Sequence, residues 1–369
     1  MEADTPYSVR DTAGQRWPML DGIVFARTSR QELAAHALHC LDSGDAESAL
    51  IALLSDQDDW WQGPVADPAA LRRLVQDQQS LSLREAMALL SWGPVADYFA
   101  HRWSDPTFLA GLALMEAHWS SPTTAFELAC GIGQYLRALA QQGVAVTGAD
   151  VVFAKLWVAR HWVVPQAELI CFDAAVAPWP LDDRRRFGLI ACHDAFYFLE
   201  PKGPILMQLR NMTDQHGAIA ISHIHNQDWP NLSPGAAMTA AGISAMFPDG
   251  IFYDDAELTH AAIERRAPRA APADALAGAE AFGVAAGPGL RSACRMRGTL
   301  AVPPDGTRLR RNPLYEGGKI AWPSKRYERE YGPRATYPMR ATCPEQAMAG
   351  GATADWALRR ELVDLPERW

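Results

Sequence analysis

The segment from residue 126 to residue 150 constrains the fold most. An apolar run beginning at Phe126 ends in a turn that contains Gly131 and Gly133, and a helical pattern follows at once. A second apolar run then ends in Asp150. Glycine lets a backbone approach a ligand closely, and a carboxylate beyond the second strand can bind ribose hydroxyls. The order strand, glycine turn, helix, strand and acid therefore predicts a site for a ligand that contains a nucleoside.

Strand and helix patterns alternate from about residue 122 to residue 226. Apolar runs that read as strands are separated by helical segments in this region. The predicted strands cover residues 124–129, 144–149, 168–172, 187–192 and 218–222. Apolar strands separated by helices form parallel sheets that are buried on both faces. We therefore predict an α/β fold with a doubly wound, mostly parallel sheet, whose ligands bind at the carboxyl ends of the strands.

The regions on either side of this core have different patterns. The N-terminal region contains a short β element with a turn at Asp21 and Gly22, and several helical patterns follow it, which predicts a helical cap. Beyond the core we expect helices up to about residue 288 and a late strand at residues 297–302. We predict an N-terminal cap, a cofactor-binding core, and an insertion with remaining strands and a substrate lid or tail, covering residues 1–118, 119–228 and 229–369.

Composition excludes several classes of function. The chain has 369 residues and a formal net charge of −9, whereas a general nucleic-acid binder is usually basic. The sequence has no apolar run of about 18 residues that would span a membrane, and its first residues lack the pattern of a signal peptide. Its six cysteines form no CxxC pair, which is typical of a reducing compartment. We expect a cytoplasmic protein with a small-molecule partner, and the sequence carries no signal for an oligomeric state.

The glycine turn fits one kind of nucleoside better than another. A dinucleotide site requires a third glycine where Leu136 stands, and bulky Tyr135 occupies the helix start where a pyrophosphate would approach. Glu127, before the turn, can receive an ammonium group directly or through water. The pattern favours a ligand that carries a ribose and an amino acid without a diphosphate.

Four short motifs resemble those of the class I S-adenosylmethionine-dependent methyltransferases. Residues 127–133, Glu-Leu-Ala-Cys-Gly-Ile-Gly, resemble the first motif, with Ala129 in place of its usual first glycine. Asp150 falls where the ribose-binding acid of the family stands, and residues 172–174 fall at the adenine position. Residues 187–195 resemble the fourth-strand motif, whose end faces the methyl group.

The resemblance implies S-adenosylmethionine as the cofactor and a Rossmann-like core. The residues that it places at the cofactor are Glu127, Ala129, Gly131, Gly133, Tyr135, Asp150, Asp173, Ala174 and His193. It covers roughly residues 122–226. It implies a methyltransferase for a small-molecule acceptor, with oxygen or nitrogen favoured as the methyl acceptor. A protein that binds the cofactor without transfer, or a nicotinamide-dependent oxidoreductase, is the alternative.

Three histidines follow the fourth and fifth predicted strands and are the candidate catalytic residues. They are His193, His223 and His225. An imidazole titrates near neutral pH, so each can act as a general base, position the substrate or form a structural hydrogen bond. We assign no metal site. An alternative is a site of His223 and His225 with the carboxylate of Asp194 or Asp228, since two histidines and one carboxylate are a known metal-binding set.

The tail from residue 312 is rich in tyrosine and arginine. Two interpretations of residues 324–331 stay open. The tyrosines and arginines together can close over the substrate as a lid, or the alternating Arg and Glu residues can form a solvated helix face.

Overall fold

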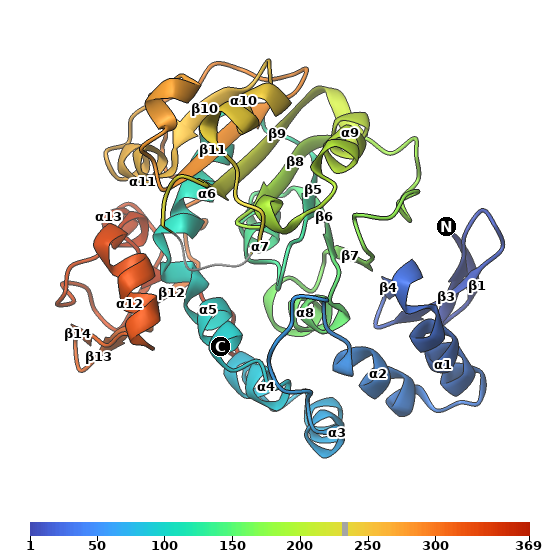
Figure 1. Cartoon of the computed structure of the whole chain (residues 1–369). Helices are drawn as coiled ribbons and strands as arrows, with labels where there is room; N and C mark the ends of the chain where they lie inside the picture. Colours follow the sequence, from blue (N-terminus) through green and yellow to red (C-terminus); the bar gives the residue numbers. More distant parts are fainter. Residues whose placement is uncertain (231–234) are drawn as a thin grey trace.

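A mixed sheet of eleven strands forms the centre of the molecule (Figure 1). The computed structural model describes residues 1–230 and 235–369. The strand order is β1-β2-β3-β4-β7-β6-β5-β8-β9-β11-β10. The strands are β1 Glu2–Thr5, β2 Ser8–Arg10, β3 Arg16–Leu20, β4 Ile23–Phe25, β5 Thr124–Leu128, β6 Ala145–Asp150, β7 Glu168–Cys171, β8 Phe187–His193, β9 Thr213–His225, β10 Ile251–Asp254 and β11 Ala281–Ala286.

The strands β4, β7, β6, β5, β8 and β9 run parallel to one another. Antiparallel strands extend this parallel centre on both sides. The sheet order turns back at β5, whose Phe126 pairs with Thr147 on β6 and with Ile190 on β8. The prediction of a doubly wound sheet with a parallel centre is confirmed. The carboxyl ends of β5, β6, β8 and β9 therefore meet at one edge, where such sheets hold their ligands.

Helices cover the sheet on both faces because successive side chains of a strand point to opposite sides. On one face Ala125 packs in the core that includes α7 (Gln134–Gln141) and α8 (Phe153–Val158). On the other face Phe126 and Leu128 pack in the core that includes α9 (Lys202–Met212). The helical segment after β6 is divided, since a π-helical turn at Ala159–Val163 follows α8.

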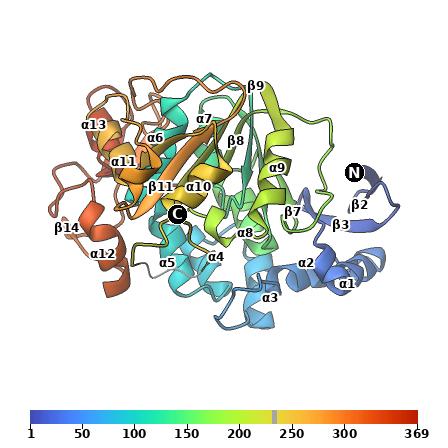
Figure 2. The same cartoon turned by 45° about the horizontal axis from the view of Figure 1, so that its top comes forward.

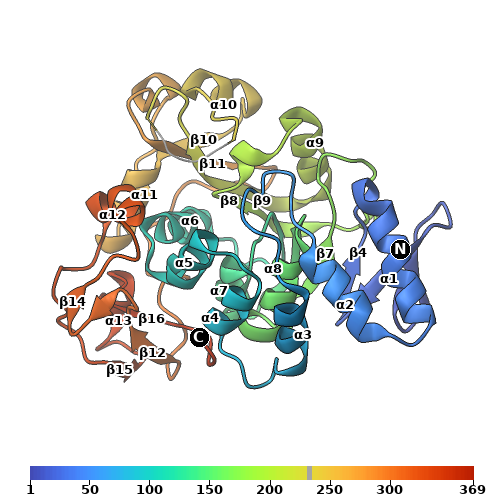
Figure 3. The ribbon, with the colours of Figure 1, turned by 60° about the horizontal axis from the view of Figure 1, so that its bottom comes forward.

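The N-terminal region joins the main sheet. Asp21 and Gly22 both have positive φ, 50° and 73°, which is the backbone of a tight hairpin turn between β3 and β4. The strand β4 then pairs in parallel with β7. The helical patterns predicted for this region are confirmed (Figure 3). The helices are α1 Gln31–Asp42, α2 Ala46–Ser55, α3 Pro68–Gln76, α4 Leu83–Leu89, α5 Pro94–His101 and α6 Pro106–Ala117.

Local capping explains where these helices begin. The side chain of Asp105 accepts from the backbone N–H of Thr107, and Pro106 occupies the first helical position of α6. Ser82 and Glu85 form a reciprocal capping box at α4. Both devices satisfy the N–H groups that a helix start leaves without an intrahelical partner.

The region after β9 differs from the sequence prediction. It holds the helices α10 (Ala240–Met246) and α11 (Asp255–Ile263), but also the strands β10 and β11, which pair antiparallel beside β9. The prediction of a late strand at residues 297–302 was wrong. Instead, the backbone N–H groups of Arg297, Gly298 and Leu300 donate to the buried carboxylate of Glu116. Residues 231–234 lie outside the described part of the chain.

The C-terminal segment forms a small lobe on the side opposite to the N terminus (Figure 2). Its elements are the sheet β15-β12-β16, the hairpin β13-β14 and two short helices. Their bounds are β12 Arg308–Arg311, β13 Tyr315–Glu316, β14 Lys319–Ile320, α12 Lys325–Tyr331, β15 Gln346–Met348, α13 Ala354–Leu358 and β16 Leu362–Val363. Tyr327, Tyr331 and Tyr337 are buried around Leu314. The tyrosines of this tail therefore form packing, while Lys325 lies on the exposed side of α12.

The last residues of the chain bind the N-terminal helices. Arg368 donates to the carbonyl oxygens of Leu81 at 3.0 Å and of His161 at 2.9 Å. Trp369 donates from Nε1 to the carbonyl of Ala100 on α5 at 3.0 Å. The C-terminal segment thus holds α5 in place. Among the described residues, no helix is long and apolar enough to cross a membrane.

Candidate active site

The glycine turn lies at the carboxyl end of β5. Gly131 and Gly133 have φ values of 56° and 80°, which favour glycine. A Cβ on Gly131 would lie 2.9 Å from Cε1 of Phe99. Ala129 also has a positive φ, 56°, at the position where the motif that it resembles usually has its first glycine. A non-glycine residue in that conformation carries about 1–2 kcal/mol of backbone strain.

Asp150 holds this turn from the end of β6. Its carboxylate accepts from the backbone N–H of Gly131 at 3.0 Å and of Val152 at 2.9 Å. The Nζ of Lys155 lies 3.6 Å from the same carboxylate. The predicted ribose-binding acid therefore also fixes the local backbone, and each carboxylate oxygen has a further lone pair for a hydroxyl donor.

Glu127 is a buried acid immediately before the turn. Its Oε2 has no hydrogen-bond partner among the described residues. Burial raises the pKa of Glu127 well above its usual value, although the guanidinium of Arg102 opposes this shift. A buried carboxyl oxygen without a partner is costly, and a ligand that donates a charged hydrogen bond would satisfy it.

The predicted adenine residues follow β7. Asp173 lies at the start of a turn, where its Oδ1 accepts from the backbone N–H of Ala175 at 2.9 Å. The carbonyl of Ala174 accepts from Nε1 of Trp179 at 3.0 Å. Asp173 therefore caps a turn directly after β7, at the same sheet edge as Asp150.

Tyr135 and His193 lie side by side between the glycine turn and β9. Their ring centroids are 4.3 Å apart. Tyr135 donates to the carbonyl of Thr107 at 3.2 Å. Nδ1 of His193 lies 2.8 Å from Oγ of Ser222, and its Nε2 has no partner among the described residues. Burial and then Arg102 lower the pKa of His193 to about 3, so its imidazole is neutral and a weak base.

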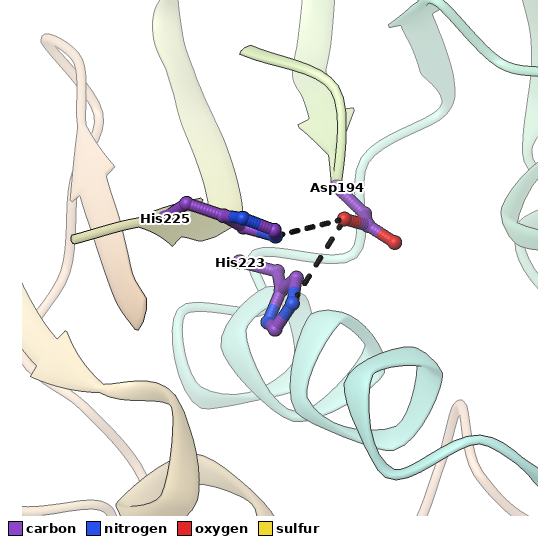
Figure 4. A group of neighbouring side chains, drawn as sticks. All are labelled: Asp194, His223 and His225. Atoms are coloured by element: carbon purple, nitrogen blue, oxygen red, sulfur yellow. Dashed lines mark ion pairs between the residues drawn. The ribbon is translucent and has the colours of Figure 1, made fainter. Parts of the chain in front are cut away.

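Asp194, His223 and His225 come together at the carboxyl ends of β8 and β9 (Figure 4). Nε2 of His223 and Nε2 of His225 each lie 3.9 Å from Oδ1 of Asp194. The sequence offered Asp194 or Asp228 as the carboxylate beside these histidines, and the structure places Asp194 there. Nδ1 of His223 donates to Oδ2 of Asp255, the first residue of α11, at 2.9 Å. Burial opposes a charged imidazole, but the carboxylates of Asp255 and Asp194 outweigh it and raise the pKa of His223.

Side chains that the sequence did not single out surround this group. Tyr98 donates to Oδ2 of Asp194 at 2.9 Å, and Tyr197 donates to Oδ1 at 3.1 Å. Arg102 forms an ion pair with Asp194 at 3.1 Å. Arg334, from the C-terminal segment, lies 3.4 Å from Asp255.

One signal could have found Asp255. The pair Asp254-Asp255 follows the apolar residues Phe252 and Tyr253 and begins a helical pattern, and the side chain of Asp254 caps α11. An acid after a strand at a helix start is a candidate for the same sheet edge. No comparable local signal marks Arg334, since its role depends on how the C-terminal segment packs.

In comparisons with known proteins, a methyltransferase family matches the region of the chain that carries the site. Residues 126–221 match the family described as "Methyltransferase domain". The chain is similar to a ubiquinone biosynthesis O-methyltransferase of Histophilus somni (strain 2336), 26% identical over 196 residues, which are 50% of this chain and 80% of that protein. The protein of the same description from Pasteurella multocida (strain Pm70) is 25% identical over 201 residues, 50% of this chain and 81% of that protein.

Solved structures of methyltransferases are also similar to it. An amino pentose methyltransferase of Micromonospora echinaspora, solved with S-adenosylmethionine bound, is 12% identical with a TM-score of 0.38, covering 51% of this chain and 94% of that one. A methyltransferase structure from Bacillus halodurans C-125 is 21% identical with a TM-score of 0.28, and the match spans 32% of this chain and about half, 52%, of that one. The family match and the sequence relatives support a class I S-adenosylmethionine-dependent methyltransferase.

Proposed function

We propose that this methyltransferase transfers the methyl group of S-adenosylmethionine to an oxygen or nitrogen atom of a small molecule. The observation that carries the proposal is the buried group of Asp194, His223 and His225 at the carboxyl ends of β8 and β9, next to the glycine turn. The relatives named for ubiquinone biosynthesis are O-methyltransferases, which agrees with a small acceptor.

The cofactor would lie across the carboxyl ends of β5, β6 and β7. The Oε2 of Glu127 supports this placement, because the ammonium of the cofactor's amino acid would supply its missing partner. Asp150 would bind the ribose hydroxyls. Asp173 and Ala174 would lie at the adenine, and Tyr135 and His193 at the methyl end. The turn residues that would let the cofactor approach the backbone are Ala129, Gly131 and Gly133.

The acceptor would bind over β8 and β9. Methyl transfer is an in-line displacement, so the protein must align the acceptor atom and increase its nucleophilicity. His223 and His225 are the groups proposed for the second task, because their rings face Asp194 in a buried site. A pKa of about 3 gives His193 the different role of a neutral contact at the methyl end.

The enclosure of the site argues for a small acceptor. Side chains from α5, α11 and the C-terminal segment pack over the histidines. The net charge of −9 disfavours a polyanionic substrate such as RNA or DNA. All six cysteines are free, which agrees with the predicted cytoplasmic location.

Calorimetric titration with S-adenosylmethionine and S-adenosylhomocysteine tests the first part. Mass spectrometry of reactions with panels of small phenols, catechols, alcohols and amines tests the second. We expect binding of both cofactor forms and the gain of one methyl group by acceptors of one class. Transfer only to RNA or to protein would contradict the small-molecule proposal. The His216→Ala variant is a control, since His216 lies on the exposed amino-terminal part of β9, away from the site.

A further inference from the structure

Three ligating side chains share one small space at the acceptor side of the site. They are Asp194, His223 and His225, and the candidate ligand atoms all lie within 4.8 Å of one another. Asp194 follows β8 directly, while the two histidines alternate with Ile224 at the end of β9. In Figure 4 both imidazole rings face the same oxygen of the Asp194 carboxylate. The side chains are 8% exposed or less, so the group is shielded from bulk water.

The distances within this group fit a shared ion better than direct contacts. Each histidine Nε2 lies 3.9 Å from Oδ1 of Asp194, which is too long for a hydrogen bond. Two atoms that each lie about 2.1 Å from one ion are at most about 4.2 Å apart. The two separations between a histidine nitrogen and the Asp194 oxygen therefore fall within the range that one bound cation allows.

Neighbouring groups orient the ligands as the outer shell of a metal site does. Nδ1 of His223 donates to Asp255 at 2.9 Å, which fixes the tautomer that presents the lone pair of Nε2 to the centre of the group. The ring of His225 stacks on Tyr197, with centroids 4.1 Å apart and an interplanar angle of 24°. A carboxylate bound to a metal-facing imidazole is a common device for raising its basicity as a ligand.

The carboxylate of Asp194 is also fixed from outside the group. Its Oδ2 accepts from Tyr98 at 2.9 Å and lies 3.1 Å from Arg102. Its Oδ1 accepts from Tyr197 and, because a carboxylate oxygen has two lone pairs, can still face the histidines. The two oxygens thus have different tasks, one held by the protein and one turned toward the imidazoles.

Backbone strain marks two of the three residues. Asp194 and His223 have φ values of 52° and 53°, in the left-handed region that non-glycine residues rarely adopt. Such conformations are energetically unfavourable and occur where a site requires a particular side-chain direction. Here the direction brings the carboxylate and an imidazole toward the same point.

We propose that Asp194, His223 and His225 bind one divalent transition-metal ion, and that the ion's remaining positions take an oxygen of the acceptor. This inference rests on the proposed small-molecule methyl transfer and specifies how its site works. Two imidazoles and one carboxylate suit Mn²⁺, Fe²⁺, Co²⁺ or Zn²⁺ better than Mg²⁺ or Ca²⁺, which prefer oxygen ligands. The acceptor class that follows is a small molecule with a hydroxyl group, such as a phenol, a catechol or a hydroxy acid.

The chemistry balances without a further reactant. Binding to the ion lowers the pKa of the acceptor hydroxyl, so the acceptor binds as the oxyanion and its proton is left in solvent when it enters the site. The oxygen then attacks the methyl carbon, a C–O bond forms and the C–S bond breaks. The electron pair of the broken bond stays on the sulfur, which leaves as the neutral thioether of S-adenosylhomocysteine.

The test measures metal binding directly. Untagged protein is stripped with a chelator and titrated with Co²⁺ in the absence of cofactor and acceptor, with binding followed by the visible absorption of Co²⁺ and by elemental analysis. We expect one equivalent to bind to the wild-type protein, an affinity at least about 100-fold weaker in His225→Ala, and unchanged binding in His216→Ala. Equal binding by wild type and His225→Ala, or no binding by wild type, would overturn the proposal.

A second variant separates a metal ligand from a group needed only for folding. Asp255→Asn keeps the shape of the side chain but weakens its hold on His223, so we expect an affinity about 10–100-fold lower and a changed Co²⁺ spectrum. An unchanged spectrum and affinity would contradict the role given to Asp255 as a positioning residue. Titration with S-adenosylhomocysteine on the same preparations verifies that each variant is folded.

The two proposals fail in different ways. Cofactor binding and methyl transfer without metal binding would overturn the metal site alone. Metal binding without transfer to any small acceptor would instead contradict the proposed function.

Discussion

The cofactor side and the acceptor side of the site are built differently. Apart from His193 at the end of β8, the proposed cofactor side comes from one continuous stretch, residues 124–174, and relies on backbone conformations and on carboxylates at strand ends. The acceptor side combines side chains from α5, β8, β9, α11 and the C-terminal segment. Local sequence is enough to build a site that contacts its ligand through the backbone. A site that contacts its ligand through side chains depends on how distant segments of the chain pack.

The largest effect should come from breaking the buried network of the acceptor side. Arg102 is 3% exposed and forms ion pairs with Asp105 and Asp194. Arg102→Met leaves these carboxylates buried without their cation, so we expect a loss of about 3–5 kcal/mol in the free energy of unfolding. Urea denaturation measures it. The matched change Arg184→Met, at a side chain that is 87% exposed, should cost under about 0.5 kcal/mol. Equal losses would show that the network does not stabilise the fold.

A change at His223 should separate the two sides by kinetics. We expect His223→Ala to lower kcat/KM by at least about 100-fold, or about 2.7 kcal/mol, while the Kd for S-adenosylmethionine changes less than twofold. The reason is that His223 contacts Asp255 and faces Asp194 rather than the glycine turn. Steady-state kinetics and calorimetry measure the two quantities. A variant that loses cofactor affinity instead would place His223 on the cofactor side.

Glu127→Gln should weaken cofactor binding and show how much stability the buried carboxyl group costs. Losing the charged partner of the cofactor's ammonium should weaken S-adenosylmethionine binding by about 10–100-fold, or about 1.4–2.7 kcal/mol. Because burial raises the pKa of Glu127 in the folded protein, its contribution to stability is present at low pH and is lost as pH rises through the folded pKa.

The same variant should therefore be more stable than wild type at neutral pH, by about 1–2 kcal/mol without cofactor. The difference should shrink as pH falls toward the unfolded pKa of the carboxyl group. Thermal unfolding across a pH series measures it. A pH-independent difference would show that Glu127 is ionised without penalty.

The smallest effect should come from Ala129→Gly. The positive φ of Ala129 costs about 1–2 kcal/mol, and the greater backbone freedom of glycine in the unfolded chain offsets part of this. We expect the variant to gain up to about 1 kcal/mol in unfolding free energy with unchanged cofactor affinity. Chemical denaturation measures the gain. A loss of stability would show that the methyl group of Ala129 contributes packing that outweighs the strain.

The strands and the glycine turn of the proposed cofactor side could be predicted from the sequence because each signal there is local. The positive φ of Gly131 and Gly133 follows from their lack of a Cβ, and the acid at Asp150 follows from the end of its strand. The histidines at the ends of β8 and β9 were found for the same reason. The partners of these histidines were not found, because Asp255 lies 32 residues beyond His223 and reaches it only after β10 and β11 pair beside β9.

The alanine-rich region shows why the rest could not be predicted. The strand β11, Ala-Phe-Gly-Val-Ala-Ala, is fully buried, yet alanine favours helices when considered alone. Its pairing with β9 and β10 overrides that preference. Likewise, residues 297–302 are apolar enough for a strand, but the carboxylate of Glu116 accepts their N–H groups instead.

The contacts of the C-terminal segment with α4, with α5 and with Trp103 directly after α5 have a consequence for synthesis. Leu83 donates its N–H to the carbonyl of Arg368 at 2.6 Å, and Arg360 donates to the carbonyl of Trp103 at 2.7 Å. Since a ribosome releases the N-terminal part first, the parallel centre of the sheet can form while α5, with Tyr98, still lacks its support. The side chains that surround the acceptor therefore take their places only after the C-terminal segment has emerged, and a partly synthesised chain can present the glycine turn before it can perform chemistry.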